Sequence, residues 1–382
     1  MKNHFALFLF FLGLNNSLIA QISENTYPIW TEMDKINTGI NEIIDQNISG
    51  KQLVLLGEAF HKSGSDLKAK TKFVKYLVKE KGFKNIIFES DFFALYFNHE
   101  KENIQGVWRK ANQCQELFNF VKNENVTLWG MDSNLYSKYS KENFTSKLSE
   151  FLNTNEIQFD PETKKNFNLV IDQNFKLSKK EYATSLRTFD SNLDKLIENE
   201  KIKNSPFWSQ ALSSLKAASL TYREKNISNS IAHRDLQMAS NLNFIVNQNP
   251  NEKFIVWAAN AHIAKADSEY MGEATMGREY LKLNPNNSYH IAFSSIKMPY
   301  RKEKRLIKDQ KSSKSLIHYL PNIDEDFFID VVSIINKNPK ILENKYYAVL
   351  WSDGRKDLKL KWFNYFDAIV FISEGELATY EK

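Results

Sequence analysis

The sequence predicts an α/β fold in which a mainly parallel sheet is flanked by helices. Short apolar segments bounded by polar residues recur along the 382-residue chain, and such segments are typical of buried parallel strands. Segments with the apolar spacing of helices separate the first three of them. This alternation indicates βαβ units, which build parallel sheets.

Six strands are expected, each from its short apolar run. They cover residues 52–58, 85–91, 126–132, 253–262, 288–294 and 366–373. Between the first two strands, apolar residues fall on one face of a helix, and Gly82 is placed to end it. The residues of that face are Leu67, Phe73, Val74, Leu77 and Val78. A further helix is expected at about residues 115–122.

Residues 137–250 differ from the rest because they are polar-rich and carry helical spacing with few strand signals. They predict a large helical insertion between the third and fourth strands, and we expect it to form the wall of the pocket. The whole of residues 21–382 is expected to be a single domain.

The N-terminus has the pattern of an export signal. Lys2 precedes the apolar run ALFLFFLGL, which is too short to span a bilayer, and Ala20 is a suitable last residue before cleavage. An uncleaved anchor is the alternative. We expect residues 1–20 to be a signal peptide and the protein to be periplasmic or secreted, with no membrane contact after processing.

Composition excludes several classes of protein. The net charge is +5, and the basic residues are interleaved with acidic ones, so no nucleic-acid partner is expected. Cys114 is the only cysteine, which excludes an intrachain disulfide and favours a buried or incidental thiol. There is no G-x-S-x-G or H-E-x-x-H motif, and residues 272–280 carry P-loop glycine spacing without the required Lys-Ser/Thr.

Four of the expected strands end in polar side chains that can carry chemistry. These are Glu58 with His61, Glu89 with Asp91, Asp132, and Asn260 with His262. Because the carboxyl ends of parallel strands lie along one edge of a sheet, we expect these side chains to converge on one crevice.

Each of these residues also has a structural interpretation. Glu58 is suited to capping a helix or to a solvated loop, His61 to a surface loop, and His262 to a structural position after the fourth strand. Glu89 directly follows the apolar segment NIIF, where an unpaired carboxylate would be costly to bury.

Arg234 lies on an otherwise apolar face of the helix expected from about residue 228. The other residues of that face are Ile231, Met238, Asn241 and Leu242. An arginine in that position needs a carboxylate or an anionic ligand. A buried ion pair and a contact to substrate are both open.

Five segments in order resemble the motifs of the erythromycin esterase family. They are LLGEAFH, GFKNIIFESD, WGMD, RDLQMASNLNFI and FIVWAANAHIAK, and FDAIVFIS near the end also matches. The resemblance covers roughly residues 50–300. It implies an α/β core with a helical part over the site, and metal-independent hydrolysis of an ester or lactone. In the antibiotic-resistance members of the family, the substrate is a macrolide.

The resemblance implies catalytic functions for four residues, namely Glu58, His61, Glu89 and His262. The residues expected to bind substrate are Arg234, Asp132, Asn260 and Lys70, and no metal or other cofactor is expected. Three positions depart from the family pattern. Ala259 replaces a histidine, Lys62 a glycine and Lys70 an arginine. These changes leave hydrolysis possible and leave the small-molecule substrate open.

Ester hydrolysis needs a base for water and donors for the oxyanion. His61, oriented by Glu58 or Glu89, is suited to take the proton, while His262 and Arg234 are suited to polarise the carbonyl. Two alternatives remain. The same acids and histidines suit a divalent metal, as in a metal-dependent hydrolase of Tiki type. The third interpretation is an exported haem-binding or small-ligand-binding protein of ChaN type.

Overall fold

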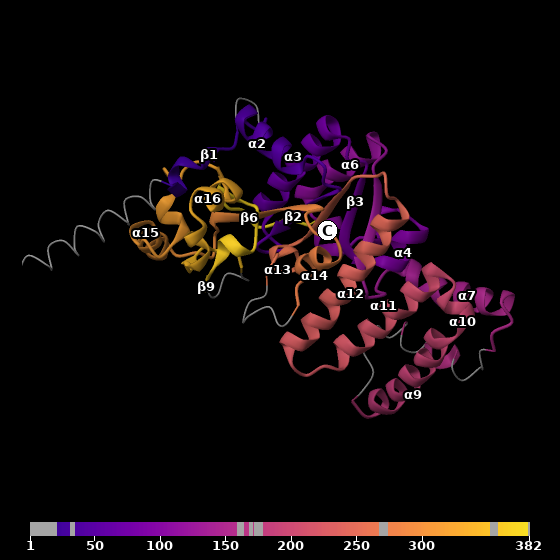
Figure 1. The fold of residues 1–382 in the computed structure, drawn as a ribbon. Coiled ribbons are helices and arrows are strands. Elements are labelled where there is room, and N and C mark those ends of the chain that lie inside the picture. The colour runs from indigo at the N-terminus through magenta and orange to yellow at the C-terminus, as the bar shows by residue number, and fades with distance from the viewer. Residues whose placement is uncertain are drawn as a thin grey trace, which may run out of the picture.

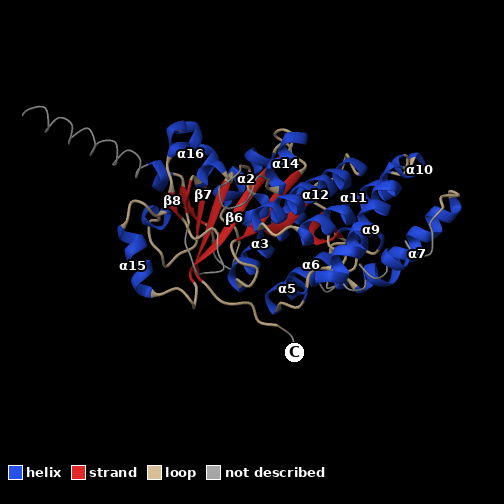
Figure 2. Ribbon diagram, turned by 90° about the horizontal axis from the view of Figure 1, so that it is seen from below, coloured by secondary structure: helices blue, strands red, loops and turns tan. Residues whose placement is uncertain are grey.

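A computed structural model shows one eight-stranded sheet with helices on both of its faces (Figures 1 and 2). It describes residues 21–30, 35–158, 164–167, 171, 179–266, 274–351 and 358–380. The strand order is β1-β7-β10-β6-β2-β5-β3-β4. The neighbours from β10 to β4 are parallel, whereas β7 is antiparallel to both β1 and β10. The predicted α/β class with a mainly parallel sheet is therefore confirmed.

The six expected strands are all present, and four short ones were not expected. The sheet consists of β1 (Thr26–Pro28), β2 (Leu53–Glu58), β3 (Asn85–Asp91), β4 (Thr127–Asp132), β5 (Phe254–Ala259), β6 (Ser288–Lys297), β7 (Phe327–Asp330) and β10 (Ala368–Glu374). A separate two-stranded ribbon consists of β8 (Tyr346–Tyr347) and β9 (Lys359–Leu360). The prediction missed the edge strand β1 and its neighbour β7, so the sheet is mixed at that edge.

The helices before β5 are α2 (Thr38–Ile48), α3 (Gly64–Lys81), α4 (Phe92–Phe97), α5 (Gly106–Arg109), α6 (Gln115–Asn123), α7 (Lys138–Thr154), α9 (Lys179–Glu198), α10 (Glu200–Lys203), α11 (Pro206–Arg223) and α12 (Ile227–Gln248). Those after β5 are α13 (Asn260–Ile263), α14 (Met276–Leu283), α15 (Glu303–Lys311) and α16 (Val331–Lys337). The 3₁₀ helices are η2 (Lys101–Asn103), η3 (Asn112–Cys114), η4 (Leu316–Tyr319), η5 (Pro339–Glu343) and η6 (Trp362–Asn364).

The two faces of the sheet follow from the alternation of side chains along its buried strands. On β2, Leu53 and Leu55 pack on the side of α11 and α12, while Val54 and Leu56 pack on the side of α2 and α3. Because both faces are covered, the strand has a continuous apolar run rather than an alternating one.

Helix α3 begins and ends at chemically specific residues. The Ser63 hydroxyl accepts a hydrogen bond from the Asp66 amide at its start. At its end, Gly82 adopts φ 73°, the left-handed conformation that glycine takes without strain. The predicted stop at Gly82 is confirmed.

Between β4 and β5, every element that the structure describes is a helix, from α7 to α12. In Figure 1, α7, α9 and α10 lie away from the sheet, and α11 and α12 connect them to it. Met238 and Leu242 of α12 are buried in the core. Helix α12 therefore carries its neighbouring residues, Arg234 among them, against the end of β4.

The expected signal peptide, residues 1–20, lies outside the described residues, as do parts of the 137–250 segment. Among the described residues, no helix combines the length and apolar character needed to cross a membrane.

Candidate functional site

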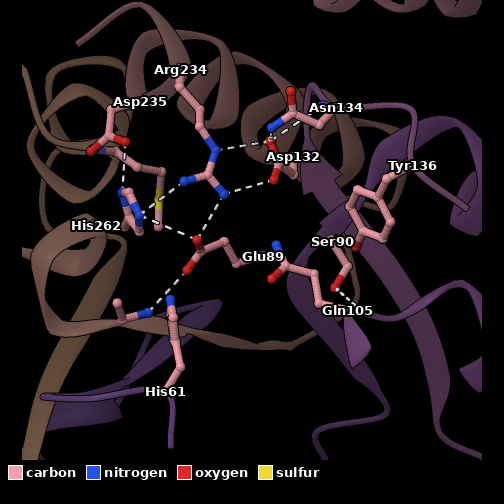
Figure 3. Close-up of polar contacts among 12 residues, drawn as sticks. His61, Glu89, Ser90, Gln105, Asp132, Asn134, Tyr136, Arg234, Asp235 and His262 are labelled. Carbon is pink, nitrogen blue, oxygen red and sulfur yellow. Dashed lines mark hydrogen bonds and ion pairs between the residues drawn. The ribbon is translucent and has the colours of Figure 1, made fainter. Parts of the chain in front are cut away.

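The site lies at the carboxyl ends of β2, β3 and β4, where the first residues after β5 and one turn of α12 meet them (Figure 3). It contains His61, Glu89, Asp132, Arg234, Asp235 and His262. Glu58, Lys70 and Trp108 are buried directly behind His61. The predicted convergence of strand ends therefore describes the arrangement of most of these side chains.

A bulge in β3 directs Glu89 toward the site. From the pair Phe88–Gly130 to the pair Asp91–Asp132, β3 advances three residues and β4 only two. The extra residue of β3 interrupts the alternation of side chains at this point. Gly130 permits the close approach, because a Cβ atom there would lie 2.4 Å from the Asp91 carbonyl oxygen.

Glu58 is a buried carboxylate that holds His61 in one orientation. His61 Nδ1 lies 2.8 Å from Glu58 Oε1, and Trp108 Nε1 donates to the same oxygen at 3.0 Å. Lys70 is fully buried and donates to Glu58 Oε2. The His61 ring stands edge-on to Trp108, and its side chain remains 36% exposed. With Nδ1 committed to Glu58, Nε2 is the nitrogen left to act on a substrate or water.

The charges around His61 set its basicity. Burial raises the pKa of Glu58, but Lys70 and His61 outweigh it, so the net pKa lies below the usual value. Burial lowers the pKa of His61, but the hydrogen bond that His61 donates to Glu58 and the charge of Glu89 outweigh it and raise the net value above 6.5. His61 is therefore a somewhat stronger base than a free imidazole.

Arg234 bridges two of the strand-end carboxylates. Its Nη2 donates to Glu89 Oε1 at 2.8 Å and to Asp132 Oδ2 at 2.7 Å, while Nε donates to Asp132 Oδ1 at 3.1 Å. The two carboxylate side chains are only 2% and 1% exposed. Nη1 lies 3.3 Å from His262 Nε2, and no carboxylate in the described part of the chain accepts from it. The Nη1 hydrogens are thus the ones available to a ligand.

His262 lies between two carboxylates. Its Nδ1 is 2.6 Å from Asp235 Oδ1, and its Nε2 is 3.2 Å from Glu89 Oε1. Asp235 is fixed in turn by the Met276 amide, which donates to Oδ2 at 3.0 Å. Burial lowers the pKa of His262, but the charges of Asp235 and Glu89 outweigh it and raise the net value to about 10. This environment favours the imidazolium form of His262 near neutral pH and so argues against His262 as the base.

Glu89 contacts both Arg234 and His262 and also a backbone amide. Burial raises its pKa, but His262 and Arg234 outweigh it and hold the net pKa well below the usual value. Its second oxygen, Oε2, accepts from the Ala259 amide at 3.2 Å. In Figure 3 the His61 ring points toward this carboxylate. Glu89 therefore links the His61 side of the site to the Arg234 side.

Two residues expected to bind substrate are buried and contact protein groups. Asn260 is buried, and its Nδ2 donates to the Phe293 and Leu350 carbonyl oxygens at 3.0 and 2.9 Å. Asn260 packs so tightly on β2 that a Cβ atom at Gly57 would lie 2.4 Å from its Oδ1. Lys70 is fully buried behind Glu58. Both residues therefore form part of the framework of the site: α13 begins at once after β5 and turns Asn260 inward, while Lys70 reaches Glu58 from α3.

The remaining strand-end acid, Asp91, caps a helix. Its Oδ1 accepts from the Ala94 amide at 3.0 Å and from the Ser140 hydroxyl at 2.8 Å. Burial raises the pKa of Asp91 to about 6. Cys114 is buried, as its lack of a nearby partner in the sequence suggested.

The sequence-based prediction missed Asp235, Trp108 and Gln105. Asp235 follows Arg234 directly, so the RD pair was the signal that both residues serve the site. Trp108 and Gln105 lie in or beside the short helix α5, where no strand-end rule applies.

The family model for erythromycin esterase matches residues 78–374, which is most of the chain. The chain belongs to the erythromycin esterase family. The match contains Glu89, Asp132, Arg234 and His262, while His61 and its partner Glu58 precede it.

Relatives of this erythromycin esterase family chain are distant in sequence. It is 24% identical over 327 residues to the Bacillus subtilis (strain 168) protein named "Putative hydrolase YbfO", covering 73% of this chain and 71% of that protein. Crystal structures show the same fold. One is of a Bacillus cereus protein (TM-score 0.73, 16% identity, 96% and 99% of the two chains covered). Another is of a succinoglycan biosynthesis protein (TM-score 0.74, 17% identity, 97% and 99% covered).

A third similar structure is that of the erythromycin esterase EreC, a histidine-to-asparagine mutant in its open conformation. The TM-score is 0.65 at 15% identity, with 92% of this chain and 98% of that chain covered. At these identities the structures establish the shared fold rather than a shared substrate.

The donor set of the site does not suit a metal ion. Arg234 occupies the space between Glu89 and Asp132, where a cation would bind, and both nitrogens of His262 face carboxylates. In the described ranges, no group of three or more His, Cys, Asp or Glu side chains is arranged to hold a metal. These contacts do not support the metal-dependent alternative.

Proposed function

We propose that this member of the erythromycin esterase family hydrolyses a carboxylic ester or lactone of a small molecule, with His61 as the general base. The hydrolase class follows from the family and from the related hydrolase. The observation that carries the mechanism is the hydrogen bond between Glu58 and His61 Nδ1, which leaves Nε2 for water at the mouth of the site.

In this mechanism, His61 Nε2 takes a proton from water as the water oxygen attacks the carbonyl carbon. Glu58 stabilises the imidazolium that forms, and the buried Lys70 keeps Glu58 ionised. Arg234, through its Nη1 hydrogens, is placed to stabilise the oxyanion. His61 then returns the proton to the departing alkoxide.

Glu89, Asp132 and Asp235 act through the cations rather than on the substrate. They hold Arg234 and His262 in a fixed arrangement, so that the donors do not reorganise when charge develops on the carbonyl oxygen. His262, as an imidazolium, adds positive charge beside Arg234 Nη1.

The test is a panel of esters and lactones assayed with the purified protein and with His61→Ala. Losing a positioned base typically lowers kcat by ~10²–10⁴-fold. His99→Ala is the matched control, because His99 also loses one hydrogen bond, to the Leu128 carbonyl, and one aromatic contact, to Trp129. A folded His61→Ala protein with near-full turnover would refute His61 as the base.

Export is part of the proposal and rests on the N-terminal pattern alone. Intact-mass analysis of the protein from its native host should show a chain beginning near residue 21. A mature protein that retains residues 1–20 would contradict it.

A further inference from the structure

A cavity of about 470 Å³ opens beside Arg234 and Asp132, on the side away from His262. The side chains that line it are those of Gln105, Asn134, Tyr136, Tyr222, Asp132 and Arg234. Ligand pockets of this size are usually lined mainly by apolar side chains. Here no Leu, Ile, Val or Phe is among the described residues that line it. The apolar part of the lining therefore comes mainly from the rings of Tyr136 and Tyr222 rather than from aliphatic side chains.

Gln105 brings an uncommitted amide group to this cavity. Its backbone amide donates to the Ser90 hydroxyl at 3.1 Å, which fixes the main chain. Its side-chain amide lies beside Glu89 in Figure 3, and no side chain or carbonyl in the described ranges hydrogen-bonds to it. A primary amide offers two donors and one acceptor, so this capacity remains for a ligand.

Asn134 supplies a complementary acceptor. Its Nδ2 donates to Asp132 Oδ1 at 3.1 Å, which orients the amide and leaves its carbonyl oxygen without a partner among the described residues. Gln105 and Asn134 therefore offer donors and acceptors from two separate segments. A hydroxyl group both donates and accepts, and it is the ligand group that matches such a pair.

The charges argue against an ionic ligand. Arg234 and His262 contribute two positive charges, while Glu89, Asp132 and Asp235 contribute three negative ones, so the cluster carries a net charge of −1. On the cavity side the Asp132 carboxylate lies beside Arg234, so an ionised ligand group there would meet a carboxylate as well as the guanidinium. A cation would find every one of the three carboxylates already paired.

We infer that this cavity binds a neutral, polyhydroxylated part of the substrate, of the sugar or polyol class, next to the scissile ester. The inference rests on the proposed hydrolase function and names its substrate class. The flat rings of Tyr136 and Tyr222 supply the apolar surface that the carbon skeleton of such a group needs. Gln105 and Asn134 form hydrogen bonds with its hydroxyl groups.

The experiment compares two six-membered lactones that differ in their hydroxyl groups, D-glucono-δ-lactone and δ-valerolactone, with spontaneous hydrolysis subtracted. The wild-type protein should prefer the hydroxylated lactone in kcat/KM by at least about tenfold, which corresponds to one well-made hydrogen bond. A preference for δ-valerolactone would overturn the inference.

Two variants test whether the cavity causes this preference. Gln105→Met keeps the side-chain volume but removes the amide, and it should reduce the preference about tenfold. Gly106→Leu should lower kcat/KM for the larger, hydroxylated lactone, since a Cβ atom at Gly106 meets nothing within 4 Å and the new side chain fills open space. Gln248→Met, exposed near the end of α12, is the control and should leave the preference unchanged. An unchanged preference in Gln105→Met would refute the assignment.

A binding measurement separates this inference from the proposed function. D-Glucitol is titrated into the His61→Ala protein and into His61→Ala with Gln105→Met, and binding is followed by saturation-transfer NMR. Binding to the first and its loss in the second support the cavity assignment, and no binding to the first overturns it. If the wild-type protein hydrolyses neither these lactones nor any ester of the panel, the hydrolase proposal fails, and the glucitol result alone decides the inference.

Discussion

Replacing Arg234 by alanine should destabilise the protein far more than a typical arginine substitution. Arg234 makes three hydrogen bonds to Glu89 and Asp132, whose side chains are 2% and 1% exposed. Its removal leaves the buried Asp132 without its counter-charge and leaves Glu89 with His262 alone. Breaking a buried ion pair in this way typically costs about 3–5 kcal/mol. We expect a loss of about 3 kcal/mol, because the 19% exposure of Arg234 admits water to the vacated space.

Arg223 is the matched control. It lies at the end of α11 and pairs with Asp190 at 2.7 Å, but the two side chains are 34% and 15% exposed. This pair is more open to solvent than the Arg234 cluster, and exposed pairs contribute only about 0–1 kcal/mol. Arg223→Ala should therefore be clearly less destabilising than Arg234→Ala, although it also removes one arginine–carboxylate contact.

The assay is equilibrium urea unfolding at pH 7, followed by circular dichroism, with catalytic turnover measured on the same samples. Arg234→Met combined with Asp132→Asn should recover part of the lost stability, because the double variant no longer buries an unpaired Asp132 charge. It should not recover turnover, since the Nη1 donors are still absent. Equal and small losses of stability in Arg234→Ala and Arg223→Ala would refute the reasoning.

Three further predictions follow from the charges behind the site. The acid limb of kcat/KM should lie above pH 6.5, because the net pKa of His61 is raised; a limb below 6.5 would contradict this assignment. The pKa of His262 is about 10 in the folded state and 6.5 in its ordinary state, so between these two pH values the folded protein binds a proton that the unfolded chain does not. The stabilisation that this proton gives the folded state is complete below pH 6.5 and is lost as the pH rises toward 10, by up to about 1.4 kcal/mol per pH unit. The free energy of unfolding of His262→Gln, measured in urea, should not show this decrease with pH. Lys70→Met should lower the melting temperature strongly, because it leaves the buried Glu58 carboxylate without its cation. Lys68→Met is the control and should change it little, because Lys68 and its partner Glu376 are 55% and 45% exposed. Equal shifts in the two variants would contradict the burial of Glu58.

The sequence predicted the parallel strands because they are buried on both faces and therefore read as continuous apolar runs. It did not predict β1 and β7, which have three and four residues. Thr26 pairs with Ile329, about three hundred residues away in the chain, and nothing in either short segment encodes that partner. Strands as short as these depend on tertiary contacts rather than on their own pattern.

The strand-end rule placed Glu58, Glu89 and Asp132 together, since parallel strands end along one edge of the sheet. It failed for Asn260, because the direction of that side chain is set by α13, which begins at the same residue. It also gave no indication of the bulge that directs Glu89, nor of Gln105, whose position comes from the loop before α5. Position along a strand is encoded locally, whereas the final direction of a side chain depends on packing around it.

The two histidines of the site differ because their surroundings differ. His262 is buried and faces a carboxylate at each nitrogen, so it keeps its proton and acts as a fixed cation. His61 is hydrogen-bonded to one carboxylate, Glu58 at Nδ1, and its side chain is 36% exposed, so its second nitrogen can exchange a proton with water. Because environments that push the pKa values of two titratable groups apart separate their functions, this difference supports the proposal that His61 is the base. In the proposed mechanism Glu89 is a positioning residue that holds His262 and Arg234 in place, while Glu58 is hydrogen-bonded to His61 and orients it.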